Sequence, residues 1–265
     1  MDIADLHAGN RDVWNRTSRG GYGRDVEADV SLLRGGGTNL MPAETRLLGD
    51  LRGVRRAIHL QCSHGLDALS LLNLGAEAVI GIDISEEMLL SAREKSDALG
   101  ANARWIRADV LDAPHDLDGT ADLVHTGRGA IPWMMDLEAW AAVVARLLRP
   151  GGRFHLFEGH PLDTLWDEEA TGFALREGAS YFADAPQAER SFPYEVALRV
   201  DPDAPVALAS RVWTVGQTVT ALVGAGLRIE RLEEHPEPFW DQFKRIPEAE
   251  FRRLPHTFSV LATKP

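Results

Sequence analysis

Short apolar segments alternate with longer amphipathic ones through the middle of the chain. Five of the short runs are apolar enough to be buried strands: residues 57–61, 78–83, 103–109, 121–126 and 153–159. Helical segments stand between most of them. A chain that alternates strand and helix in this way forms a parallel sheet with helices on both faces. The pattern therefore predicts an α/β protein with a doubly wound sheet.

Three of the helices have recognisable ends. The first covers residues 65–74, and the second begins after Ser85, a favourable N-cap residue, and stops at Gly100. The third follows Asp136 and is expected to end at Pro150-Gly151-Gly152. Its apolar residues fall on one buried stripe, at helical spacing: Leu137, Trp140, Ala141, Val144, Leu147 and Leu148.

The alternation stops on both sides of a core expected at residues 41–160. Residues 1–40 are polar and interrupted by glycines, which predicts a short helix or two and a lid over the core. Residues 161–212 contain five prolines and several aromatic residues without periodicity, which predicts an inserted cap. Regular structure resumes in residues 213–265 with a helix that opens on a capping box, followed by two strands. The expected inward residues of that helix are Val215, Val219, Leu222 and Val223.

Composition limits the classes of function. The formal net charge of −12 disfavours a nucleic-acid partner, because nucleic acids are bound through basic patches. The single cysteine, Cys62, rules out an intramolecular disulfide and a cysteine-rich zinc site, and it fits a reducing cytoplasm. The N-terminus lacks the pattern of a secretory signal, and no run of about eighteen apolar residues could span a membrane. We expect a soluble cytoplasmic protein.

Two carboxylates stand where ligands bind in open parallel sheets, beyond the carboxyl ends of the strands. Asp83 ends the second strand, and a carboxylate at that position can accept both hydroxyls of a ribose. The alternative role of an N-cap suits Ser85 better. Asp109 ends the third strand and could accept a hydrogen bond from an adenine amino group, the alternative being an exposed loop residue. The two positions predict a nucleoside site.

The turn after the first strand reads Gln61-Cys62-Ser63-His64-Gly65 and lacks the usual glycines. In dinucleotide sites those glycines let the backbone approach a pyrophosphate. A cofactor without phosphates does not need that approach, and the polar side chains of this turn suit an amino-acid group. The turn therefore predicts a nucleoside cofactor that carries no phosphate.

Five stretches together resemble class I S-adenosylmethionine-dependent methyltransferases of small molecules, in order and spacing. They read AIHLQCSHGLDALSL, GIDISEEMLLSAR, RADV, ADLVHTGRGAIPWM and LLRPGGRFHLFEGHP. The resemblance implies a Rossmann-like, seven-stranded sheet whose last strand is antiparallel, and an enzyme that uses S-adenosylmethionine and releases S-adenosylhomocysteine. The chain departs from the family pattern at His59, where an acidic residue is usual, and at Gln61 and Ser63, where glycines are usual. These departures define an "LQC" variant of the first motif.

The resemblance also implies where the cofactor would lie. Its methionine part would contact residues 61–65, its ribose Asp83, its adenine Asp109, and its sulfonium would lie near Gly127. The full set of implied cofactor contacts is Gln61, Cys62, Ser63, Gly65, Asp83, Ile84, Met88, Asp109, Val110, Thr126 and Gly127.

The methyl acceptor would bind beyond the sulfonium. Methyl transfer requires mainly alignment of the reacting atoms, and a base is needed only if the accepting atom must lose a proton. Glu158 and His160 end the fifth strand and are the candidate catalytic residues. The alternatives are a carboxylate that binds backbone amides and an ordinary loop histidine. Tyr22 in the lid, with Arg128 and Trp133 after the fourth strand, are the candidate acceptor contacts.

We therefore expect a methyltransferase that acts on a nitrogen or oxygen atom of a small molecule, such as a bacterial secondary metabolite. The alternatives are a nicotinamide-dependent oxidoreductase, disfavoured by the absent Gly-x-Gly-x-x-Gly, and a non-catalytic nucleoside-binding relative. No metal is expected, because His155 faces away from residues 158 and 160 on a strand. The aromatic residues of the cap fit an acceptor pocket or a homo-oligomer interface equally well.

Overall fold

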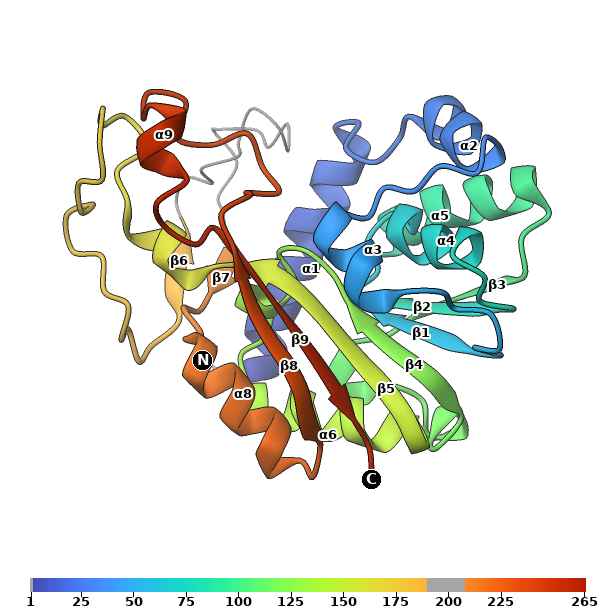
Figure 1. The fold of residues 1–265 in the computed structure, drawn as a ribbon. Coiled ribbons are helices and arrows are strands. Elements are labelled where there is room, and N and C mark those ends of the chain that lie inside the picture. The colour runs from blue at the N-terminus through green and yellow to red at the C-terminus, as the bar shows by residue number, and fades with distance from the viewer. Residues whose placement is uncertain (1, 190–207) are drawn as a thin grey trace.

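A seven-stranded sheet runs through the described part of the chain, which in this computed structural model comprises residues 2–189 and 208–265 (Figure 1). The strand order is β3-β2-β1-β4-β5-β9-β8. Strands β1 to β5 pair in parallel, whereas β9 is antiparallel to both of its neighbours. The bounds are β1 Ala57–Leu60, β2 Val79–Asp83, β3 Ala103–Arg107, β4 Ala121–Thr126, β5 Leu148–Gly159, β8 Arg228–His235 and β9 Thr257–Thr263. The predicted fold class is confirmed.

Helices cover both faces of the sheet. One face carries α3 (Pro42–Leu48), α4 (Leu66–Asn73) and α5 (Glu86–Leu99), and the other carries α6 (Leu137–Leu147) and α8 (Val215–Gly224). The predicted caps are present: the side chains of Ser85, Asp136 and Thr214 accept hydrogen bonds from backbone N–H groups of the first turns of α5, α6 and α8. Short 3₁₀ helices follow several strands: η1 Val110–Asp112, η2 His115–Leu117, η3 Ile131–Trp133 and η4 Pro161–Leu165.

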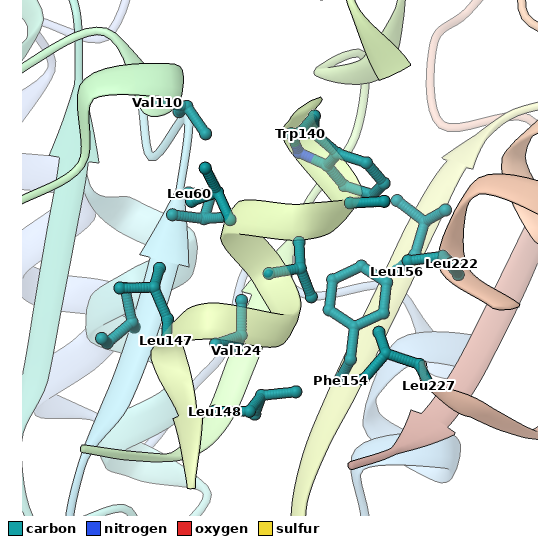
Figure 2. Close-up of a cluster of buried hydrophobic side chains, with 14 of the residues drawn as sticks. Leu60, Val110, Val124, Trp140, Leu147, Leu148, Phe154, Leu156, Leu222 and Leu227 are labelled. Atoms are coloured by element: carbon teal, nitrogen blue, oxygen red, sulfur yellow. The ribbon is translucent and has the colours of Figure 1, made fainter. Parts of the chain in front are cut away.

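The main core lies between the sheet and the layer of α6 and α8 (Figure 2). Because side chains alternate along a strand, Ile58 and Leu60 of β1 face this core while His59 faces α3 and α4. Trp140 of α6 packs edge-on against Phe154 of β5, with ring centroids 5.7 Å apart. This packing holds the carboxyl ends of the strands at fixed positions relative to one another.

The ends of some elements differ from the sequence predictions. Strand β5 begins at Leu148 rather than at residue 153, because Pro150-Gly151-Gly152 does not end the helix but lies within the strand. The backbone N–H of Gly151 donates to Lys264 and that of Lys264 donates to Gly152, a pairing with distant residues that periodicity cannot show. The third strand ends at residue 107 rather than 109. Val223 of α8, predicted to face inward, is 54% exposed, whereas Leu222 is fully buried.

Two further segments cover the carboxyl ends of the strands. The N-terminal helices are α1 (Ile3–Arg19) and α2 (Val26–Arg34), and α1 is longer than the short helix expected from the sequence. The predicted cap contains η4 and a small sheet of β6 (Gln187–Glu189) and β7 (Leu208–Ser210), near α9 (Glu248–Phe251) (Figure 1). The rest of the predicted cap, residues 190–207, lies outside the described residues. No helix in the described ranges is long and apolar enough to cross a membrane.

Candidate cofactor and acceptor site

A cavity of about 700 Å³ lies at the carboxyl ends of the parallel strands, between the sheet, α1 and the cap. It has the size of a small-molecule site. The structure brings together at this cavity most of the residues that the sequence pointed to: Tyr22, Gln61, Cys62, Ser63, Asp83, Ile84, Met88, Asp109, Val110, Gly127, Arg128, Trp133, Glu158 and His160. Two predicted residues, Gly65 and Thr126, do not line it.

The turn after β1 keeps the backbone shape of a glycine-rich motif without the glycines. Gln61 has φ 54°, Ser63 has φ 49° and Gly65 has φ 78°, so all three alternating positions are left-handed. Residues other than glycine rarely adopt this conformation, and they adopt it at some cost. The side chain of Gln61 donates a 2.6 Å hydrogen bond to the carbonyl of Ala130, which ties the turn to the segment after β4. The turn therefore has a left-handed backbone at these positions, and two of them carry polar side chains in place of the usual glycines.

Gly65 and Thr126 have packing roles. A Cβ added at Gly65 would lie 2.6 Å from Trp105 and 2.7 Å from Ala92, so only glycine fits where the turn enters α4. Thr126 is fully buried at the end of β4, and its hydroxyl has no hydrogen-bond partner among the described residues. The geometry gives neither residue a direct contact with a molecule in the cavity.

Asp83 lies at the floor of the cavity, at the end of β2. One carboxylate oxygen accepts from the backbone N–H of Ser63 at 2.7 Å and the other from that of Ser85 at 2.8 Å. Burial raises the pKa of this carboxyl to about 6, against the opposing effect of the backbone hydrogen bonds. The backbone of Ile84 also interacts with this carboxyl, so of the four acceptor positions of the carboxylate one remains for a ligand hydroxyl.

Asp109, after β3, is bound by a residue of the N-terminal helix. His7 Nδ1 lies 2.6 Å from the carboxylate, while His7 Nε2 accepts from the backbone N–H of Met135 at 3.2 Å. Because Nε2 is the acceptor, Nδ1 carries the hydrogen that is donated to Asp109. Burial opposes ionisation of Asp109, but this hydrogen bond and one from Leu111 outweigh it and hold the pKa of the carboxyl below its usual value.

Helix α1 supplies cavity residues that the sequence analysis missed, namely His7, Asn10 and Trp14. Its buried face is mostly polar. Asn10 exchanges two hydrogen bonds with the backbone of Ala209 in β7, at 2.8 and 2.9 Å, and Asn15 accepts one from the hydroxyl of Ser85 at 2.7 Å. A search for apolar stripes cannot find such a helix. The available signal was the recurrence of His7, Asn10 and Trp14 at helical spacing.

Tyr22, predicted to belong to a lid, is placed over the turn after β1. Its ring packs edge-on against His64 at 5.5 Å, and the neighbouring Gly23 carbonyl accepts hydrogen bonds from Ser91 and Lys95 of α5. Burial raises the pKa of Tyr22 to about 12, so its phenol is neutral. The loop that carries Tyr22 is thus fastened to the core of the protein.

Backbone N–H groups occupy all the hydrogen-bond acceptor positions of the Glu158 carboxylate. One oxygen accepts from Gly129 at 2.6 Å and from Gly159 at 2.7 Å, and the other accepts from Ala130 at 2.8 Å and Ile131 at 2.9 Å. Four donors occupy the four acceptor positions of a carboxylate. This geometry favours the alternative interpretation, in which Glu158 shapes the segment after β4 and is not a base.

His160 is also engaged at both ring nitrogens. Nε2 lies 2.9 Å from the carboxylate of Glu234, and Nδ1 accepts from the backbone N–H of Leu162 at 3.2 Å, which caps η4. Burial lowers the pKa of the imidazole, although the carboxylate of Glu234 opposes that effect. In this arrangement His160 has no lone pair available to accept a proton from an acceptor molecule.

A buried group of charges lies at the end of the cavity nearest the turn after β1. Asp67 accepts hydrogen bonds from Arg128 at 2.7 Å and from Asn39 at 2.6 Å, and Arg128 Nε lies 3.8 Å from Glu44. Burial raises the pKa of the fully buried Glu44 to about 8. Asp67 was not among the predicted site residues, and Arg128 lies in this group rather than in the aromatic half.

The opposite half of the cavity is aromatic. Trp14 of α1 packs edge-on against Trp133 at 5.6 Å, and further walls come from the cap and the segment after β8. The additional aromatic residues that line the cavity are Trp166, Trp213, Phe239, Trp240 and Phe258. Phe182 of the cap, in contrast, is 81% exposed. The cavity therefore joins a polar half at the strand ends to an aromatic half under the cap.

Comparison with known proteins agrees with this geometry. Residues 57–152 match the model of a family described as methyltransferase domain. Demethylmenaquinone methyltransferase of Thermus thermophilus is 38% identical over 87 residues, which are 33% of this chain and 38% of that protein. Ribosomal protein L11 methyltransferase of Photobacterium profundum is 33% identical over 104 residues, which are 39% of this chain and 33% of that protein. The chain thus spans about a third of the length of these curated relatives.

Many solved structures are similar over most of the chain. An S-adenosylmethionine-dependent methyltransferase from Mesorhizobium loti superposes with a TM-score of 0.63 at 24% identity, covering 84% of this chain and 96% of that one. This likeness extends the shared fold beyond residues 57–152 and includes the antiparallel end of the sheet.

Proposed function

Residues 57–152 form a class I S-adenosylmethionine-dependent methyltransferase domain, and on that premise we propose that the protein methylates a nitrogen or oxygen atom of a small molecule. The observation that carries the proposal is that Asp83 and Asp109 line the same cavity as the aromatic residues under the cap. The nucleoside would occupy the polar half, with its ribose on Asp83. The acceptor would occupy the aromatic half.

The enclosure of the cavity supports a small acceptor. Helix α1 is fastened to the end of β3 through His7 and to the cap through Asn10, so the site is covered from two sides. A side chain of a large protein would have to reach the sulfonium through this cover. The indole N–H of Trp166 is buried beside the cavity and has no hydrogen-bond partner among the described residues, which makes it a candidate donor to a polar group of the acceptor.

The residues at the strand ends would act by alignment and by exclusion of water. When bound, S-adenosylmethionine supplies an electrophilic methyl group on a positively charged sulfur. Glu158 fixes residues 129–131, and Gln61 ties the same segment to the turn after β1, so the wall of the transfer site is rigid. Because Glu158 and His160 are fully hydrogen-bonded, the acceptor would attack with a lone pair that it already carries, as a neutral amine does.

Calorimetric titration and a turnover assay test the proposal. We expect S-adenosylmethionine and S-adenosylhomocysteine to bind in the micromolar range and NADH not to bind. With methyl-labelled S-adenosylmethionine, label should pass to members of a panel of aromatic amines and hydroxyl compounds, with release of S-adenosylhomocysteine. Binding of NADH alone would favour the oxidoreductase alternative. Transfer only to protein acceptors such as ribosomal proteins would overturn the small-molecule part of the proposal.

A further inference from the structure

We propose that Asp67 and Arg128 bind the amino-acid end of S-adenosylmethionine, Asp67 receiving the ammonium group and Arg128 the carboxylate. This inference rests on the proposed function and extends it to residues that the family pattern does not assign. It also moves Arg128 from the acceptor side, where the sequence placed it, to the cofactor side.

The geometry of Asp67 leaves one oxygen available. Oδ1 accepts both of the hydrogen bonds that reach the side chain, from Asn39 and from Arg128. Oδ2 accepts none from any described residue, yet Asp67 lines the cavity with a side chain that is only 17% exposed. Oδ2 is not among the fully buried unpartnered oxygens of the described residues, so it opens onto the cavity, where a carboxylate oxygen can accept a hydrogen bond from whatever occupies it. The free oxygen is therefore a place for a donor that comes from a ligand.

A second observation points to the same place. A methyl group added at Gly127 would lie 3.2 Å from His59 Nε2, 3.5 Å from His125 Nε2 and 3.6 Å from Asp67 Oδ2. These two imidazole nitrogens are buried and have no hydrogen-bond partner among the described residues. Two of these three atoms, His59 Nε2 and Asp67 Oδ2, belong to side chains that line the cavity beside a residue that has no side chain. An ammonium group can donate to Asp67 Oδ2 and, in the tautomer of His59 whose Nε2 carries no hydrogen, to that nitrogen as well.

The charges of the group also suit a zwitterion. The family's usual acidic residue is replaced by His59, whose pKa burial lowers to about 4, so position 59 is neutral at pH 7. Glu44 holds its proton at pH 7, since burial raises its pKa to about 8. Asp67 remains ionised, because the charge and hydrogen bond of Arg128 outweigh the effect of burial on the pKa of its carboxyl. One negative and one positive group are left to face an ammonium and a carboxylate.

Arg128 has N–H groups available to donate to the carboxylate of the ligand. Its guanidinium has five N–H groups, of which one donates to Asp67, and Nε lies beyond hydrogen-bond distance from Glu44 at 3.8 Å. A guanidinium binds a carboxylate through two parallel hydrogen bonds when its fork is free. The side chain is 16% exposed and lines the cavity beside Gly127. The carboxylate of Asp67 can thus bind the ammonium group of the ligand while the guanidinium of Arg128 binds its carboxylate.

A ligand series separates the two contacts. S-adenosylmethionine carries both charges of the amino-acid end, decarboxylated S-adenosylmethionine lacks the carboxylate, and 5′-methylthioadenosine lacks both. By calorimetry, Asp67→Asn should weaken the first two at least tenfold and change the third by no more than about twofold. Arg128→Gln should weaken S-adenosylmethionine at least tenfold and leave the decarboxylated ligand nearly unchanged.

Controls keep the inference separate from folding and from the proposed function. Arg104 and Asp116 form an exposed pair at 3.7 Å, and Arg104→Gln and Asp116→Asn should leave all three affinities unchanged. Retained binding of 5′-methylthioadenosine shows that a variant is folded. If Asp67→Asn weakens all three ligands equally, or none, the assignment of Asp67 is wrong. If the unaltered protein binds none of the three, the proposed function fails and this inference fails with it.

Discussion

His7 and Asp109 lie 102 residues apart in the chain, and a 2.6 Å hydrogen bond joins them. The bond connects the N-terminal helix to the end of the strand where an adenine would lie. His7 also accepts a hydrogen bond from Met135, after β4, through its second ring nitrogen. A single imidazole therefore joins α1 to the segments that follow β3 and β4, and α1 forms part of the wall of the cavity.

Replacement of His7 should loosen this wall. His7→Ala removes two hydrogen bonds and leaves Oδ2 of Asp109 without its donor, a loss of about 1–3 kcal/mol, while Oδ1 keeps the backbone N–H of Leu111. We expect S-adenosylhomocysteine to dissociate about tenfold faster, which stopped-flow fluorescence of the neighbouring tryptophans would measure. Arg11→Ala, on a more exposed part of the same helix, is the matched control. Equal dissociation rates in the two variants would contradict the bridging role of His7.

Glu158 should matter for stability rather than for proton transfer. In Glu158→Gln, an amide nitrogen faces two backbone N–H groups in place of an acceptor, and two buried donors lose their partner. We expect the free energy of unfolding to fall by at least about 2 kcal/mol in urea titrations. Glu168→Gln, at another carboxylate that lines the cavity, controls for the loss of charge. A variant of normal stability that binds cofactor but has no turnover would instead support a base.

The sequence was sufficient for positions that obey a general rule. Asp83 and Asp109 were found because ligands lie beyond the carboxyl ends of parallel strands, and that rule needs only the order of elements. The rule says nothing about what a side chain bonds to. It could not reveal that Glu158 would be saturated by backbone amides, or that His160 would cap a short helix.

The residues that were missed depend on contacts between distant segments. Helix α1 buries a polar face, so its place over the site cannot be read from hydrophobic periodicity. Asp67 is recognised as a site residue only through its hydrogen bonds with Arg128, 61 residues later, and with Asn39, 28 residues earlier. Pairing of Pro150-Gly151-Gly152 with Lys264 likewise made a strand from residues that are typical of a turn.

The left-handed backbone of the turn after β1 makes a prediction about Ser63. Replacing a residue at φ 49° by glycine removes about 1–2 kcal/mol of strain, and the extra freedom of glycine in the unfolded chain offsets part of it. Ser63→Gly should therefore raise the free energy of unfolding by about 0.5–1 kcal/mol. Ser63→Ala is the matched control, because it loses the same hydroxyl but keeps the Cβ. If the alanine variant is as stable as the glycine variant, the backbone at this position is not strained.

Three histidines form a buried row across the sheet, on the face that carries α3. His59, His125 and His155 are direct neighbours in the registers of β1, β4 and β5, and ring centroids of successive residues lie 4.7 and 5.2 Å apart. No group of three or more potential ligands in the described ranges is arranged to hold a metal. Burial lowers the pKa of His155 to about 3, and nearby Arg153 and His235 lower it further. The row is therefore a set of neutral imidazoles that the folded protein protects from protonation.

This row should make the protein sensitive to acid. Between pH 6.5 and about 3 the unfolded chain binds a proton at His155 that the folded chain does not, so the stabilising contribution is complete above pH 6.5 and is lost as the pH falls. His155→Leu removes the loss of stability that protonation of His155 in the unfolded chain causes at low pH. Relative to the unaltered protein, the variant should gain up to about 1.4 kcal/mol of unfolding free energy per pH unit between pH 6 and 4.5, in urea titrations. His115→Leu, at an exposed histidine, controls for the loss of a histidine as such. A stability difference between His155→Leu and the unaltered protein that does not change with pH would show that His155 binds its proton equally well in the folded and unfolded chains, which contradicts the lowered pKa.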